Sequence, residues 1–353
     1  MTFFIHATNV HSGGGHFLLR TLLQALPADC HAIALLDTRL QLAQELSPNL
    51  TIKRVAPSLW QRLKAERWLA KTVKQHDFVL CFGNLPPLFA LRAKTLVFVQ
   101  NRYLIDPVKL NKFTLKTRLR LMVERFWLAK KTHHATGFVV QTPSMRDLLE
   151  ASGFIAGKAA NVLPFVNDTA GYERSPTIVS SRKAAYDFIY VASGEPHKNH
   201  RHLIEAWALL ARSGVRPSLL LTLDKEMHPE LCLWINVQKT RFELHVDNLG
   251  AQPHDEVLNL YTQVRALIYP SVFESFGLPL IEARQAGLAI LAAELDFVRD
   301  VVDPDQVFDP HSPVSIARAV QRFLGNEEAA LPLMNAEEFL ARIFQVGELS
   351  CAS

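Results

Sequence analysis

Two carboxylates stand eight positions apart in the stretch FESFGLPLIEA (273–283), Glu274 before a Gly-Leu-Pro corner and Glu282 after it. The preceding run ALIYPS (266–271) is typical of a strand, and open α/β sheets bind ligands beyond the carboxyl ends of their strands. Glu282, in the first turn of the next helix, can accept hydrogen bonds from both hydroxyls of a ribose, and Glu274 would then face a sugar. The alternative is a pair of solvated acids that flank a loop.

The corner itself could bind an anion through its backbone. Pro279 stands where the helix would begin, a position that favours proline. The free N–H groups of Phe276, Gly277 and Leu278 would then point towards the cleft, and the helix dipole behind them favours negative charge. The spacing therefore predicts that one strand-to-helix connection holds both a nucleotide and a sugar.

A glycine-rich loop, NVHSGGGHF (9–17), lies between an apolar run and a helical pattern. Its glycines, Gly14 and Gly15 among them, let a backbone approach a ligand closely at the start of a helix. The loop is not a complete GxGxxG motif, because Leu18 takes the place of the last glycine. The residues alone leave two interpretations open, a phosphate cradle and a flexible turn.

A third candidate segment, YVASGEPHKNHRHLIEAW (190–207), follows the strand that opens the second half of the chain. Lys198, near the start of the next helix, can supply a mobile positive charge to a diphosphate. Ser193 and Gly194 could add a hydroxyl and a backbone donor. The alternative is a solvated lysine at a helix start.

The elements that would position these segments alternate between strand and helix. Continuous apolar runs suit strands that are covered on both faces, as in parallel sheets. The pattern predicts an α/β fold with two Rossmann-like, doubly wound parallel-sheet domains. The predicted strands are 2–8, 30–37, 51–56, 77–83, 94–101 and 136–142 in the first half, and 186–193, 218–224, 242–250, 266–271 and 287–294 in the second.

A polar stretch with Gly and Pro separates the two sets of strands. We therefore expect an N-terminal domain over 1–168, a linker over 169–185 and a C-terminal domain over 186–330. A further helix is expected in 331–353, where it could pack back on the N-terminal domain. The cleft between two such domains is the default ligand site.

The bulk composition excludes several classes of protein. The 353 residues are 49% hydrophobic and 20% charged, as in ordinary globular proteins, and the net charge of +4 is too small to indicate nucleic-acid binding. The four cysteines are scattered, without a CxxC pair or metal-ligand spacing, which predicts reduced thiols. The first residues lack the pattern of a signal peptide, so we expect a cytoplasmic protein.

Together, these motifs resemble those of retaining glycosyltransferases of the GT-B fold, glycosyltransferase family 4 in particular. FESFGLPLIEA matches the family's EX7E signature, and ASGEPHKN is similar to its phosphate-binding SxxPxKN segment. The resemblance covers most of the chain, because further stretches follow in the family's order: FVVQTPSMRDLL (138–149), NVLPFVND (161–168) and RDVVDPDQVFDPHSP (299–313).

The resemblance implies transfer, with retention, from a UDP- or GDP-linked sugar, and it implies no metal or other cofactor. On the matching positions, Glu274 would hold the hydroxyls of the donor sugar and Glu282 the ribose. The backbone of residues 276–278 would contact the sugar and phosphate. Lys198 would neutralise the diphosphate, and Lys198 and Glu274 would be the catalytic residues. The glycines of the first loop, Gly14 and Gly15, would approach the diphosphate from the first domain.

The chain departs from its relatives at two places that bear on the site. Many relatives carry Arg at the position of Ser193, and some carry a His after the strand that corresponds to LVFVQN (96–101). In this chain we expect Asn101, Arg102 and His16 to line the acceptor side.

Two basic segments lie in the first half of the chain. Trp60 and Trp68 stand among the cations of residues 53–76, and basic helices with tryptophans suit an anionic membrane surface. The alternative is solvated helix faces, and the aromatic residues show no base-stacking pattern that would indicate nucleic acid. Residues 102–134 contain nine cations against Asp106 and Glu124: Arg102, Lys109, Lys112, Lys116, Arg118, Arg120, Arg125, Lys130 and Lys131.

The sequence therefore predicts a retaining hexosyltransferase that acts on a glycan or lipid-linked acceptor, in the synthesis of a bacterial surface polysaccharide such as lipopolysaccharide, O-antigen or capsule. A nucleotide-sugar epimerase or a phosphorylase on the same two-domain plan is the first alternative. An inactive nucleotide-sugar binder is the second, although such a protein need not keep both Glu274 and Glu282.

Overall fold

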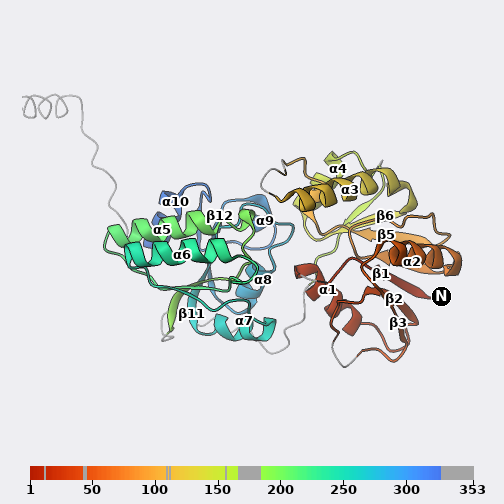
Figure 1. Ribbon diagram of the computed structural model, residues 1–353, viewed down its shortest axis with the longest axis horizontal. Coiled ribbons are helices and arrows are strands. Elements are labelled where there is room, and N and C mark those ends of the chain that lie inside the picture. The colour runs from red at the N-terminus through yellow and green to blue at the C-terminus, as the bar shows by residue number, and fades with distance from the viewer. Residues whose placement is uncertain are drawn as a thin grey trace, which may run out of the picture.

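The protein folds into two α/β lobes that lie side by side (Figure 1). The computed structural model describes residues 1–11, 13–42, 46–108, 110, 113–155, 157–165 and 184–326. The first lobe holds a parallel sheet of seven strands, and the second a parallel sheet of six. The predicted architecture of two parallel-sheet α/β domains is confirmed. Most of the expected linker and the whole of the expected C-terminal helix lie outside the described residues, so the domain boundaries stay predictions.

The first sheet has the order β3-β2-β1-β4-β5-β6-β7. Six of its strands lie where the apolar runs predict them, and β7 is an addition of three residues. That edge strand is partly exposed, so it lacks the apolar run that marks a buried strand. The strands are β1 (Phe3–Ala7), β2 (Ala32–Asp37), β3 (Leu50–Val55), β4 (Phe78–Cys81), β5 (Lys94–Phe98), β6 (Gly137–Val140) and β7 (Ala160–Val162).

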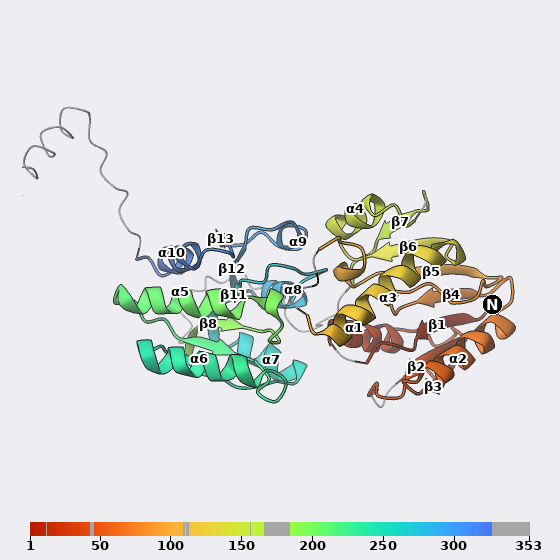
Figure 2. The same ribbon diagram turned by 45° about the horizontal axis from the view of Figure 1, so that its top comes forward.

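Helices cover both faces of this sheet (Figure 2). Leu19 and Leu23 of α1 (Gly13–Gln24) belong to the apolar cluster on one face. The cluster on the other face contains buried leucines and a methionine from α2 (Leu59–Thr72), α3 (Leu115–Lys131) and α4 (Pro143–Ala151). The glycine-rich start of α1 therefore lies on the opposite face from the two basic helices, α2 and α3.

The second sheet has the order β10-β9-β8-β11-β12-β13. The short β13 is again an addition, because its three residues stand in a polar stretch. The strands are β8 (Tyr186–Tyr190), β9 (Leu219–Leu221), β10 (Val246–Asn248), β11 (Val264–Tyr269), β12 (Ala289–Ala293) and β13 (Gln306–Phe308). The helices are α5 (His200–Arg212), α6 (Pro229–Phe242), α7 (His254–Tyr261), α8 (Leu278–Gln285), α9 (Asp296–Arg299) and α10 (Pro313–Phe323).

The helix starts differ in how their N–H groups are satisfied. Ser58, Thr114, Thr142 and Ser312 cap α2, α3, α4 and α10 with side-chain oxygens. The start of α8 has no such cap, since its N-cap residue is Gly277. Its first N–H groups therefore stay available to a ligand. None of the described helices is long and apolar enough to cross a membrane.

Candidate active site

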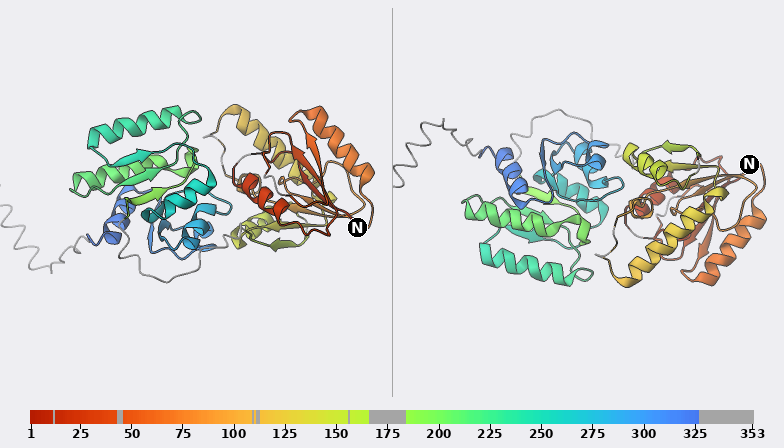
Figure 3. Two further views of the ribbon diagram at one scale, coloured as in Figure 1. Left: turned by 90° about the horizontal axis from the view of Figure 1, so that it is seen from below. Right: turned by 90° about the horizontal axis from the view of Figure 1, so that it is seen from above.

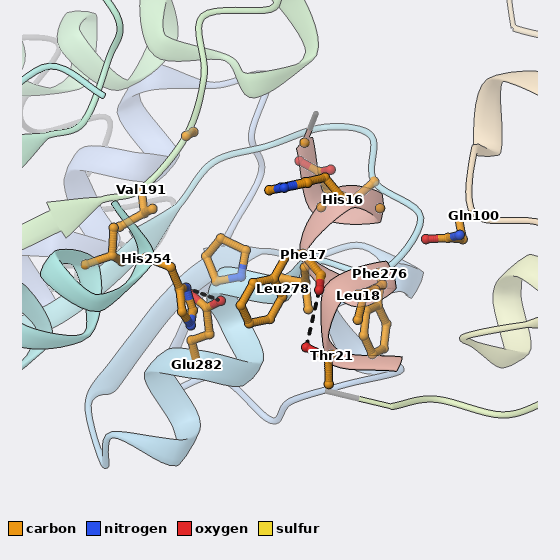
Figure 4. Close-up of a pocket in the computed structure, with 18 of the residues that line it drawn as sticks. His16, Phe17, Leu18, Thr21, Gln100, Val191, His254, Phe276, Leu278 and Glu282 are labelled. Atoms are coloured by element: carbon orange, nitrogen blue, oxygen red, sulfur yellow. Dashed lines mark hydrogen bonds and ion pairs between the residues drawn. The ribbon is translucent and has the colours of Figure 1, made fainter. Parts of the chain in front are cut away.

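A cavity of about 940 Å³ lies between the two lobes (Figure 4). Its walls come from α1 in the first lobe, and from α7 and the β11–α8 corner in the second. Most of the predicted site residues line it, although they come from three distant parts of the chain. They are Gly14, Gly15, His16, Lys198, Glu274, Phe276, Gly277, Leu278 and Glu282.

Lys198 and Glu274 form an ion pair in this cavity, with 2.6 Å between the lysine Nζ and the carboxylate Oε1. The same oxygen accepts hydrogen bonds from the Ser271 hydroxyl at 2.6 Å and from the Tyr269 hydroxyl at 3.2 Å. The lysine is placed by a short 3-10 helix, η4 (Pro196–Lys198), whose last carbonyl accepts from the buried Tyr190 hydroxyl at 2.6 Å. Both charged groups are therefore held in place before a ligand arrives.

The carboxylate of Glu274 is ionised in this setting. Burial by itself raises its pKa, but the charges of Lys198 and His197 and the hydrogen bonds from Lys198 and Ser271 outweigh burial and lower it. A carboxylate with a lowered pKa is a weak base. Glu274 is thus better suited to accept hydrogen bonds from sugar hydroxyls than to remove a proton.

Glu282 lies in α8 on the other side of the corner. Its Oε2 accepts a hydrogen bond from the Tyr261 hydroxyl at 3.2 Å, and its Oε1 is 3.6 Å from Nδ1 of His254. Burial raises the pKa of Glu282 to about 7, and the Tyr261 hydrogen bond offsets only part of this. The pKa of His254 is lowered, mainly by burial, so this imidazole is neutral near pH 7. The two corner acids therefore have pKa values shifted in opposite directions, which their spacing could not show.

The starts of α1 and α8 meet across the cavity. A Cβ atom on Gly14 would lie 3.2 Å from Cδ1 of Leu278, so the first glycine loop approaches the N-terminus of α8 closely. Gly277 has a φ of +74°, and a Cβ there would lie 3.0 Å from Cδ1 of Leu280. Two helix N-termini thus face the same space, an arrangement that favours a bound anion.

Replacing Gly277 with alanine should weaken nucleotide binding. The new side chain would have to adopt a left-handed backbone conformation and would press on Leu280, which would shift the free N–H groups. Gly287→Ala is the matched control, because Gly287 also has a positive φ of +69° but nothing lies within 4 Å of its Cβ position. Both variants should lose about 1–2 kcal/mol of unfolding free energy. Only Gly277→Ala should raise the dissociation constant for UDP or GDP in calorimetry, and equal affinities would contradict this use of the corner.

Two predicted donor residues lie outside this cavity. The hydroxyl of Ser193 donates to the carboxylate of Glu195 and is not free. Gly194 lines a separate cavity and packs against the ring of His228, which leaves no room for a side chain. A diphosphate role for this pair stays a prediction that this structure does not favour.

Two of the predicted acceptor-side residues, Asn101 and Arg102, follow β5 in the first lobe and do not line the cavity. Asn101 caps the 3-10 helix η1 (Arg102–Leu104), where its side chain accepts from the Tyr103 N–H at 3.0 Å. Arg102 pairs with Asp106 at 2.9 Å, and its guanidinium lies 4.6 Å from the ring centroid of Phe273. Phe273 precedes Glu274, so this contact connects the first lobe to the corner.

The cavity also contains residues that the sequence did not single out. Phe17 and Arg20 of α1 line it, and the Phe17 ring lies 4.3 Å from the ring of His254 in the other lobe. Gln100 and Gln141 face it from the ends of β5 and β6. Among the described residues, Oε1 of Gln100 and Nε2 of Gln141 are buried without a hydrogen-bond partner. The two glutamines could have been found from the sequence, because each lies near the end of a predicted strand. Nothing in the sequence singled out His254.

Comparison with known proteins agrees with this geometry. The family model for glycosyl transferases group 1 matches residues 173–337. The O-antigen chain mannosyltransferase B of Escherichia coli is 30% identical over 141 residues, which are 39% of this chain and 37% of that protein. The match therefore spans little more than a third of the length of that relative.

Solved structures match nearly the whole chain. Anabaena HepE in complex with UDP-glucose has a TM-score of 0.67 at 15% identity, with 92% of this chain and 90% of that chain covered. Sucrose-phosphate synthase from Thermosynechococcus elongatus has a TM-score of 0.64 at 17% identity, with the same coverage. At these identities the structures show the fold alone. This chain therefore has the GT-B fold, and its residues 173–337 match the family of glycosyl transferases group 1.

Proposed function

We propose that this protein transfers a hexose from a nucleoside diphosphate sugar to a glycan or lipid-linked acceptor, with retention of configuration. The observation that carries the proposal is that three features line one cavity. They are the Lys198–Glu274 ion pair, the uncapped start of α8, and Glu282 with its raised pKa. A donor has a diphosphate, a ribose and a sugar, and each of these features suits one part.

The diphosphate would lie between Lys198 and the N-termini of α1 and α8. Arg20 lines the same cavity from the first lobe, so it is a candidate for the positive charge that many relatives carry at the position of Ser193. Glu282 would accept from the ribose hydroxyls, and Glu274 from those of the sugar. The UDP-glucose bound to a protein of the same fold supports a nucleotide sugar as donor.

The proposed transfer takes place on one face of the sugar. The bond between the anomeric carbon and the diphosphate oxygen breaks, and the bond from that carbon to the acceptor oxygen forms. The acceptor proton passes to the leaving phosphate, because Glu274, with its lowered pKa, is a weak base. The neutral imidazole of His16, whose pKa is lowered mainly by burial and by Arg20, lines the first-lobe wall where the acceptor would bind.

The mannosyltransferase relative acts on an O-antigen chain by its name, which supports a role in bacterial surface polysaccharide synthesis. The choice between a UDP- and a GDP-linked donor, the requirement for a metal and the cytoplasmic location stay predictions. A nucleotide-sugar epimerase would need no acceptor, and an inactive binder would release no nucleotide. Acceptor-dependent release of the nucleoside diphosphate separates both from the proposed transferase.

Thermal unfolding with UDP, GDP and ADP tests the donor site directly. A ligand at 100 times its dissociation constant adds about 2.7 kcal/mol of stability, which shifts the unfolding temperature by several degrees. We expect one nucleotide to shift the wild type and not Glu282→Ala. The control is Glu256→Ala, at an exposed position in α7 that does not line the cavity. A shift of equal size in both variants would exclude Glu282 as the ribose ligand.

The same measurement should depend on pH. The ionised form of Glu282 is the better acceptor for two hydroxyls, and its pKa of about 7 means that it is largely neutral at pH 6. Between pH 6 and pH 8 its ionised fraction rises about tenfold, so nucleotide affinity should rise by up to that factor. Affinity that stays constant over this range in wild type would contradict the assignment.

A further inference from the structure

Helix α3 presents a row of large apolar side chains to solvent. Leu121 and Leu128 are buried against the sheet, so the exposed row is a second apolar stripe rather than the core-facing one. The exposed fractions are 79% for Leu115, 64% for Leu119, 59% for Met122, 54% for Val123 and 65% for Phe126. Monomeric proteins rarely expose a continuous apolar patch that has no partner.

The spacing places this row on one side of the helix. The five positions follow an i, i+4, i+7, i+8, i+11 pattern, which occupies a stripe about 100° wide on a helix with 3.6 residues per turn. The two buried leucines lie on the opposite side. The row therefore faces away from the sheet along most of the length of α3.

The start of α2 adds to the same surface. Helices α2 and α3 cover one face of the first sheet and lie next to each other in the view from above (Figure 3, right). Glu124 of α3, whose pKa is raised by burial, is stabilised in its charged form by Arg120 and by Arg62 of α2. Just before Arg62, Leu59 and Trp60 are 87% and 78% exposed. We call these two residues and the five of α3 the α3 surface.

Positive charge flanks this surface. Helix α3 carries Lys116, Arg118, Arg120 and Lys130 beside the row, against one acid, Glu124, which Arg120 approaches to 4.0 Å. In the part of the chain that the structure describes, the other three cations of that set form no ion pair. Two copies of this surface would bring these cations together, which disfavours self-association. An anionic layer with an apolar interior satisfies both the charges and the exposed side chains.

We propose that the α3 surface docks on an anionic lipid bilayer. The apolar row would enter the boundary between headgroups and acyl chains, while the flanking cations would contact the headgroups. Trp60 suits the same boundary, where amphipathic rings are favoured. This docking would hold the first lobe, which carries the proposed acceptor side, at the membrane. It does not depend on the transfer chemistry proposed above.

Co-sedimentation with vesicles tests the proposal. The purified chain should bind vesicles of phosphatidylcholine with about 30% phosphatidylglycerol and should bind pure phosphatidylcholine vesicles at least about tenfold more weakly. The double variant Leu119→Gln/Phe126→Gln should lose at least about tenfold in affinity for the anionic vesicles. The double variant Lys116→Gln/Lys130→Gln should lower the affinity and its dependence on salt.

The matched control is Leu233→Gln/Val237→Gln on α6, which removes two similarly exposed apolar side chains from the other lobe. It should bind vesicles as the wild type does, and all variants should unfold at nearly the same temperature, since each changed side chain is exposed. The proposal is overturned if the wild type ignores anionic vesicles or if the α3 and α6 variants bind equally. A wild-type dimer in light scattering that Leu119→Gln/Phe126→Gln converts to monomer, without vesicle binding, would instead make this surface a contact between copies.

Discussion

Replacing Lys198 with alanine is expected to slow sugar transfer by about 100- to 1,000-fold, the usual loss when one group that stabilises developing charge is removed. In the proposed reaction negative charge grows on the leaving diphosphate, and Lys198 is the cation held next to it by η4 and Glu274. The rate of nucleoside diphosphate release with acceptor present measures the loss. Lys225→Ala, at an exposed position of the same lobe, should leave the rate unchanged.

A second variant separates catalysis from folding. Lys198→Ala leaves the carboxylate of Glu274 without its cation, and breaking one half of a buried pair costs about 3–5 kcal/mol. The double variant Lys198→Ala/Glu274→Gln removes that unpaired charge, so it should recover stability. It should not recover the rate. If transfer returns together with stability, Lys198 only maintains the structure and the proposed role at the diphosphate is wrong.

Replacing His6 with alanine is expected to lower the free energy of unfolding by about 3–5 kcal/mol, because it leaves a buried carboxylate unpaired. Nε2 of His6 in β1 lies 3.1 Å from Oε1 of Glu66 in α2, and both residues are almost fully buried. The other carboxylate oxygen of Glu66 accepts from the Leu88 N–H at 2.9 Å. Denaturant unfolding measures the loss, and His76→Ala, beside Asp77 but largely exposed, should change stability by less than about 0.5 kcal/mol.

The same pair gives the protein a dependence of stability on pH. Burial alone would lower the pKa of His6, but the charge of Glu66 and hydrogen bonds with Cys81 and Glu66 raise it from 6.5 to about 10. Its contribution is therefore complete below pH 6.5 and is lost as the pH rises towards 10. The pKa of Glu66 is lowered, chiefly by His6 against the effect of burial, so its contribution is lost at acidic pH. His6→Ala should remove the alkaline part of this profile, and an unchanged profile would show that His6 is neutral in the native state.

The fold could be predicted from the sequence because its signals are local. Apolar runs long enough to be buried on both faces marked eleven of the strands, and the glycine loop and Pro279 marked the helix starts that line the cavity. The strands that were missed, β7 and β13, have three residues each. A segment that short is held by pairing with its neighbour, so its own sequence carries little pattern.

Most residues of the site could be predicted individually from the sequence, but their contacts and protonation states could not. Lys198 and Glu274 are 76 positions apart, and only the packing of η4 against the end of β11 makes them a pair. The different protonation of Glu274 and Glu282 follows from burial and from which partners surround each of them. The contacts of Arg102 with Phe273 and of Ser193 with Glu195 likewise appear only in the folded chain.

By itself, the sequence determined the alternation of strands and helices, the two-lobe plan and the residue types available for a nucleotide sugar, since periodicity and turn chemistry depend on near neighbours. Tertiary structure alone decided which charges meet, which acid titrates near pH 7 and which of the two apolar stripes on α3 faces the sheet. Those properties arise from contacts between distant segments and from the exclusion of water, and neither is set by the order of residues along one element.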